Sequence, residues 1–150
     1  MKPLLVLILT FTIAVITLKG IQKQYDFALS SRIALSAMLL FTAVGHFAFT
    51  KGMTMMIPNV VPYKKQLVYL TGIIEVLAAI GLLIPNLRAL TGWLLIAFFI
   101  ILLPSNIHAA IKHVDYQKGT FDGNGPNYLW FRIPLQVLFI LWTYISAIWL

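Results

Sequence analysis

Five long apolar segments, separated by shorter polar stretches, run along the chain. They cover about residues 3–18, 29–49, 67–84, 89–111 and 128–150. None of them alternates apolar and polar residues with the period of two that marks a half-buried strand, so each predicts a helix. Most match the roughly 20 residues that a helix needs to cross the hydrocarbon core of a bilayer. The pattern therefore predicts an all-α, polytopic transmembrane helical bundle that forms a single domain over residues 1–150.

The composition supports a bilayer rather than water as the surroundings of these helices. Hydrophobic residues make up 61% of the chain and charged residues 10%, and the mean hydropathy is +0.92. Soluble domains are about half apolar and about a quarter charged. A soluble core of this size cannot hide so much apolar surface, whereas a membrane accepts it and requires each backbone group to be satisfied inside a helix or a closed barrel.

Cysteine content and charge exclude several classes of function. The sequence contains no cysteine, so this chain carries neither a thiol redox mechanism nor a thiolate metal site. Its net charge is +7, but the basic residues are spread over loops and helix ends. This distribution is typical of membrane topology and not of a nucleic-acid interface, so we expect no nucleic-acid partner.

The first apolar segment, residues 3–18, is only just long enough to cross a bilayer. Lys2 and Lys19 flank it and can extend their ammonium groups to the two interfaces. The alternative is a signal peptide with Lys2 as its basic start. No small-x-small cleavage site follows Leu18, so we expect a membrane span.

The distribution of lysine and arginine predicts the orientation. If all five segments cross the membrane, one side carries seven basic residues and the other side four. The larger group is Lys2, Lys51, Lys64, Lys65, Lys112, Lys118 and Arg132; the smaller is Lys19, Lys23, Arg32 and Arg88. Cytoplasmic loops are enriched in basic residues, so we expect the N-terminus and the loops 50–66 and 112–127 in the cytoplasm.

Residues 50–66, TKGMTMMIPNVVPYKKQ, form neither a span nor an ordinary polar loop. The methionines and aliphatic residues are apolar, while Pro58 and Pro62 prevent a long regular helix. An interfacial segment against the mouth of the bundle fits this pattern, with a hydrophobic loop that has no ligand role as the alternative. The short connection PNLR at 85–88 makes the third and fourth segments antiparallel neighbours.

Glu75 is the only acidic residue inside any apolar segment. It follows Leu67 by eight residues, about 12 Å along a helix and near the middle of a bilayer. An acid at this depth costs at least a few kcal/mol when charged and unpaired, so it needs a proton, a partner or water. Since consecutive segments alternate direction, His46, His108 and Arg132 all lie toward the same membrane surface.

Helical spacing predicts which faces of the helices turn inward. Residues three or four apart share a face. Glu75 therefore shares a stripe with Thr71, and Gly72 lies beside it on a small-residue face that packs against another helix. Arg132 shares a face with Gln136 on the last segment. Each helix thus offers a polar stripe that a bundle can turn inward.

Pro104 interrupts the fourth segment close to two polar residues. Asn106 and His108 are two residues apart, so a regular helix points them about 200° from each other. Pro104 cannot donate to the carbonyl of Ile100, and we expect it to kink the helix and re-aim the next turn. We expect Asn106 and His108 to satisfy the freed carbonyl.

These observations combine into one candidate site, a shared interior pocket for a ligand. Its predicted lining is His46, Glu75, Asn106, His108 and Arg132. The alternative is a purely structural buried pair, Glu75 with Arg132 or with a histidine, that holds the helices in register. No helix carries a His-x-x-His or Glu-x-x-His pair, so we expect no metal site.

Several short motifs also resemble those of the DoxX-like family of bacterial membrane proteins. They are GHF at 45–47, MIP at 56–58, TGIIEVLAAIGLLIP at 71–85, GW at 92–93, PSNIH at 104–108 and LWFRIPLQ at 129–136. The resemblance extends over about residues 30–142 and implies a four-helix transmembrane core, to which residues 3–18 add an N-terminal transmembrane helix. It also implies that His46, Glu75, Asn106, His108 and Arg132 are the recurring polar residues; Ser105 stands where alanine is common.

The resemblance implies a role beside membrane redox enzymes. The family takes its name from a subunit associated with a thiosulfate:quinone oxidoreductase. We therefore expect a non-catalytic accessory subunit in the bacterial cytoplasmic (inner) membrane, surrounded by lipid, that binds a quinone or another lipophilic ligand. It would work in a membrane redox complex or as a homo-oligomer, with no covalently bound cofactor.

Two other classes of function stay open. One is a proton-linked transporter or channel in which Glu75 titrates. The other is a purely structural assembly subunit.

Overall fold

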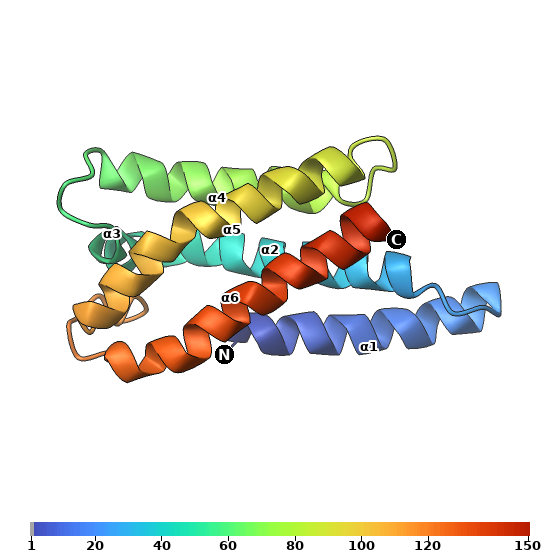
Figure 1. Ribbon diagram of the computed structural model, residues 1–150, viewed down its shortest axis with the longest axis horizontal. Coiled ribbons are helices and arrows are strands. Elements are labelled where there is room, and N and C mark those ends of the chain that lie inside the picture. The colour runs from blue at the N-terminus through green and yellow to red at the C-terminus, as the bar shows by residue number, and fades with distance from the viewer. Residues whose placement is uncertain (1) are drawn as a thin grey trace.

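The computed structural model describes residues 2–150, and helices dominate the fold (Figure 1). The long helices are α1 (Lys2–Gln22), α2 (Phe27–Ala48), α4 (Lys64–Gly81), α5 (Arg88–Ile111) and α6 (Leu129–Thr143). The short elements are α3 (Thr50–Met56), a 3-10 turn η1 (Pro126–Tyr128) before α6, and a π-helical end η2 (Tyr144–Trp149) after it. All five predicted apolar segments are helical, and residues 2–150 contain no strand, so the all-α prediction is confirmed.

Four helices are long and apolar enough to cross a membrane: Lys2–Gln22, Phe27–Ala48, Arg88–Ile111 and Pro126–Trp149. The fifth, α4, is outside this group because its 18 residues include Lys64, Lys65 and Glu75. Many large apolar side chains on the long helices face outward, among them Leu9 and Ile101. An outer surface of this kind is suited to lipid, and the fold is that of a membrane protein.

Consecutive long helices run in opposite directions (Figure 1). The contacts between helices join α1 to α2, α2 to α4, and α5 to α6 and η2. At one end, the Lys2 ammonium donates a 3.4 Å hydrogen bond to the side chain of Gln117, in the loop after α5. The start of α1, α3 and the loop 112–125 therefore share one end of the bundle, the end that carries most of the basic residues.

Small residues set how closely two pairs of helices approach. A Cβ atom added at Gly72 of α4 would lie 2.9 Å from Cβ of His46 on α2. One added at Gly92 of α5 would lie 2.9 Å from Cβ of Ala147 in η2. Both distances are too short for a carbon contact, so only glycine allows these backbones to approach so closely.

The helix of the third apolar segment, α4, begins and ends earlier than the apolar pattern predicts. It ends at Gly81 rather than at residue 84. The amide group of Leu82 still donates to the carbonyl of Ala78, but those of Leu83 and Ile84 donate to the carbonyls of Ile80 and Gly81 with the tighter spacing of a 3-10 turn. Pro85 follows directly and cannot continue a helix, whereas hydropathy alone does not register this change.

Candidate functional site

The contact between α2 and α4 at Gly72 brings His46 against Thr71 and Glu75. His46 Nε2 lies 3.4 Å from Oε2 of Glu75. On the other side of the ring, Nδ1 lies 3.1 Å from the carbonyl oxygen of Val68 and 3.0 Å from the hydroxyl oxygen of Thr71. The Thr71 hydroxyl itself donates to the Val68 carbonyl at 2.9 Å. Two successive turns of α4 thus contact the imidazole at both ring nitrogens.

These contacts depend on the tautomer of the ring. A carbonyl oxygen only accepts hydrogen bonds, so the contact with Val68 is a hydrogen bond in the tautomer that has its hydrogen on Nδ1 of His46. In a neutral ring, Nε2 is then a bare acceptor that faces another acceptor, Oε2 of Glu75. The contact is favourable only with one proton between the two groups, either on the imidazole or on the carboxyl group. In both forms the pair is neutral overall, which reduces the cost of burying it.

Glu75 is almost completely enclosed. Its exposed fraction is 4%, and Oε2 has no hydrogen-bond partner within residues 2–150. The 3.4 Å separation from His46 satisfies the distance of an ion pair, but the geometry is not that of a hydrogen bond. An oxygen in such a position has unused capacity for a hydrogen bond, and native proteins leave few buried groups in that state.

A second polar cluster joins α5 to α6. Arg132 donates to Oδ1 of Asn106 at 2.7 Å, and Nδ2 of Asn106 donates to Oε1 of Gln136 at 3.3 Å. Nε2 of Gln136 in turn donates to the carbonyl of Phe99 at 2.6 Å. The donors and acceptors follow one direction from the guanidinium to the backbone, so the chain fixes the orientation of both amide groups.

This series of hydrogen bonds ends at the carbonyl of Phe99, next to the backbone that Pro104 disturbs. Pro104 lies inside α5, which continues to Ile111, and the carbonyl that loses its donor is that of Ile100. The expectation that Asn106 and His108 donate to this carbonyl is wrong, because neither makes that hydrogen bond within residues 2–150; Gln136 donates to a different carbonyl, the neighbouring one of Phe99. Asn106 is occupied by its partners on α6.

The five predicted site residues lie in three places. His46 and Glu75 form one pair between α2 and α4, Asn106 and Arg132 form another between α5 and α6, and His108 belongs to neither. No ion pair or hydrogen bond within residues 2–150 joins Glu75 to Arg132. The structure therefore does not connect these side chains through one chamber, and their role in binding a ligand stays a prediction.

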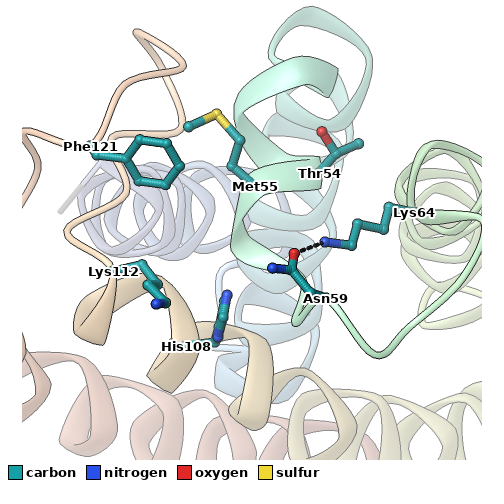
Figure 2. Close-up of a pocket in the computed structure, with 7 residues that line it drawn as sticks. All are labelled: Thr54, Met55, Asn59, Lys64, His108, Lys112 and Phe121. Atoms are coloured by element: carbon teal, nitrogen blue, oxygen red, sulfur yellow. Dashed lines mark hydrogen bonds between the residues drawn. The ribbon is translucent and has the colours of Figure 1, made fainter.

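His108 lines an open pocket of about 480 Å³ at the basic end of the bundle (Figure 2). The other lining residues come from α3 and the segment after it, from the start of α4, and from the end of α5 and its loop. They are Thr54, Met55, Asn59, Lys64, Lys112 and Phe121. Figure 2 shows His108 in the last turn of α5 and Lys112 just beyond the end of that helix, with Lys64 reaching toward Asn59, to which it donates at 2.8 Å.

A smaller groove of about 260 Å³ lies between α4 and α5. Its lining is almost entirely apolar: Ile74, Leu77, Ala78, Thr91, Leu94 and Leu95. Ile74 precedes Glu75 in sequence, and Ala78 lies almost one turn beyond it. The groove therefore passes the turn of α4 that carries the buried acid, whose own side chain faces α2 and does not line the groove.

Sequence reasoning missed the partners that position the candidate residues. Gln136 and Thr71 were expected on inward faces, but not as hydrogen-bond partners of Asn106 and His46. The pocket residues Thr54 and Asn59 carried no signal, because their segment follows neither a helical nor a strand period. Among residues 2–150, no three histidine or acidic side chains gather as metal ligands would.

Fold and geometry together define a class, a small helical membrane protein in which a part-buried imidazole lies against a buried carboxyl group. Within this class, the chain belongs to the family described as Domain of unknown function (DUF8561), whose model matches residues 35–147. The match begins inside α2 and leaves α1 outside. A search of curated proteins gives no match, and neither does a search of solved structures.

Proposed function

We propose that the protein is a DoxX-like subunit of the bacterial cytoplasmic membrane that binds a quinone-like lipophilic molecule beside the His46–Glu75 pair. Its core is the four-helix bundle of α2, α4, α5 and α6, with α1 as an additional N-terminal span. In this proposal the protein is an accessory to a membrane redox complex and has no redox centre of its own.

The observation that carries the proposal is the contact between the part-buried imidazole of His46 and the buried carboxyl group of Glu75. Intramembrane ionisable groups are costly and usually functional. Oε2 of Glu75 is buried and lacks a hydrogen-bond partner, although His46 stands 3.4 Å away. A quinone carbonyl near this oxygen would complete the arrangement, because a protonated carboxyl group donates to a carbonyl.

The groove between α4 and α5 provides a site for the apolar part of such a ligand. Ile74 and Ala78 line it on both sides of Glu75 along α4. Its wall is aliphatic except for the Thr91 hydroxyl, as expected for an isoprenoid or acyl chain. A ligand that approaches from lipid would therefore reach the acid-bearing turn without crossing a polar region.

In this proposal the chain supplies a proton to the quinone and the partner enzyme supplies the electrons. Quinone reduction takes up protons together with electrons. The His46–Glu75 pair can hold and release one proton within the membrane, which is the role of a general acid. Electrons would come from the partner enzyme.

The test is quinone affinity of the purified protein in lipid nanodiscs, measured by quenching of tryptophan fluorescence with a short-chain ubiquinone and a menaquinone. Glu75→Gln replaces the carboxyl group with an amide that cannot titrate and should weaken binding at least tenfold, which corresponds to about 1.4 kcal/mol for one charge-assisted hydrogen bond. The matched control is Asp122→Asn, the same chemical change at an exposed acid. Equal affinity for both variants and the unchanged protein overturns the proposal.

A structural role for the pair gives a different result. It predicts that Glu75→Gln lowers the melting temperature while quinone affinity stays the same. Thr71→Val provides a second, milder variant, because it removes one contact of the His46 ring and leaves both titrating groups in place. In our proposal, Thr71→Val weakens quinone binding, whereas Thr71→Ser, which keeps the hydroxyl group, binds quinone as tightly as the unchanged protein.

A further inference from the structure

The open pocket at the basic end of the bundle is separate from the His46–Glu75 pair. Its cationic side chains come from two helices: Lys64 from the first turn of α4, and Lys112 just beyond the end of α5, one turn after His108. Asn59 adds an amide group between them (Figure 2). Cations converge here from segments far apart in the sequence, which distinguishes the pocket from a row of surface lysines on one helix.

No acidic side chain balances this charge. None of the lining residues is acidic. The nearby loop acids Asp115 and Asp122 lie 3.7 Å and 4.0 Å from the ammonium of Lys118, which does not line the pocket. An anion is therefore the ligand that the local charge favours.

The donors in the pocket are also largely unused. Lys64 donates one of its three N–H groups to Asn59. The side chains of His108 and Lys112 make no hydrogen bond or ion pair to any of residues 2–150. Two ammonium groups and an imidazole in one concave site provide several donors to a tetrahedral oxyanion, as in phosphate sites.

The position of the pocket in the fold indicates whether its anion comes from a lipid or from solution. It opens beside α3 at the end of the bundle where the long apolar helices end. Met55 and Phe121 add apolar surface to its rim. Its volume of about 480 Å³ lies within the range of small-ligand sites and exceeds what a lone phosphate ion needs.

We propose that this pocket binds the phosphate group of an anionic phospholipid from the leaflet at the basic end of the bundle. Lys64 and Lys112 neutralise the phosphate, and His108 donates to its ester or free oxygens. Met55 and Phe121 contact the glycerol and the first acyl carbons. His108 then serves a lipid site at the membrane surface, a role apart from the quinone-binding pair.

The decisive comparison uses two neighbouring lysines. Lys64 lines the pocket, whereas Lys65 is exposed and does not. The full-length protein is placed in phosphatidylcholine nanodiscs with a minor share of phosphatidylglycerol, and retained phosphatidylglycerol is measured by native mass spectrometry. Lys64→Gln should weaken retention about tenfold, through the loss of one charge-assisted hydrogen bond to the phosphate, and Lys65→Gln should leave it unchanged. Equal retention by the two variants overturns the proposal.

A second pair keeps the test valid if Lys64→Gln disturbs folding. Lys112 lines the pocket just beyond the end of α5, and Lys118 in the following loop does not. Lys112→Gln should reduce retention, while Lys118→Gln should not. A similar small loss in both variants would mean general surface attraction and would refute a built site.

Two further arms separate the ligand sources and the two proposed sites. If millimolar inorganic phosphate displaces phosphatidylglycerol, the site recognises phosphate as such and soluble phosphate esters share it; without displacement, the lipid is the ligand. Glu75→Gln should retain phosphatidylglycerol normally, because its partner His46 does not line the pocket. Loss of lipid in Glu75→Gln together with a normal melting temperature would contradict two independent sites.

Discussion

Replacement of Gly72 by alanine tests the helix contact on which the buried pair depends. The added Cβ would lie 2.9 Å from Cβ of His46 and 3.2 Å from two ring atoms of Phe47. Since Cβ of His46 moves only with its backbone, α2 and α4 must separate. Overpacking of this kind costs about 1–3 kcal/mol. The higher helix propensity of alanine returns at most about 1 kcal/mol.

Gly20→Ala provides the control that isolates the packing cost. Gly20 is helical, and its added Cβ would meet nothing within 4 Å. Both variants gain the propensity of alanine, so the difference between them is the packing cost alone, about 1–3 kcal/mol. At about 2–4 °C per kcal/mol, Gly72→Ala should melt about 2–12 °C below Gly20→Ala in scanning calorimetry of the nanodisc protein. Equal melting temperatures would refute the close contact at Gly72.

Two further predictions concern the polar chain between α5 and α6 and the loop beyond α5. Gln136→Met keeps the side-chain volume but leaves Asn106 and the Phe99 carbonyl without their partner, so we expect a loss of about 1–3 kcal/mol, measured as a lower melting temperature; no change would mean that water replaces the amide. A hydrogen bond from Thr120 lowers the pKa of Asp122, and Thr120→Val should therefore raise that pKa toward its ordinary value in a carbon-detected NMR titration. An unchanged or lower pKa would contradict this contact.

The helices and the inward stripe of α4 could be predicted from the sequence because both depend on local periodicity. Hydropathy alone located five helices, since lipid requires long apolar segments. Spacing placed Thr71 and Gly72 on the face of Glu75, and the structure turns this face toward α2. The membrane depth predicted for each residue from its place in its helix correctly indicated that His46 could reach Glu75.

The choice of partners could not be predicted, because it depends on which helices touch. Depth places Arg132 and His46 toward the same surface, but only the packed bundle shows that α4 lies against α2 while Arg132 bonds to Asn106. The lipid pocket also needs tertiary structure. Its lining includes Asn59 and Lys112, which are far apart in the sequence, and Asn59 lies in an irregular segment that has no helical or strand periodicity.

The most direct test of the central claim is the infrared difference spectrum of the reconstituted protein with and without bound quinone. A buried carboxyl group that donates a hydrogen bond to the quinone changes its stretching frequency when the ligand binds. We predict a carboxyl difference band in the unchanged protein and in Asp122→Asn that disappears in Glu75→Gln. Quinone that binds without any carboxyl band, or with a band that survives in Glu75→Gln, would contradict the assignment of Glu75 and His46 as the binding site.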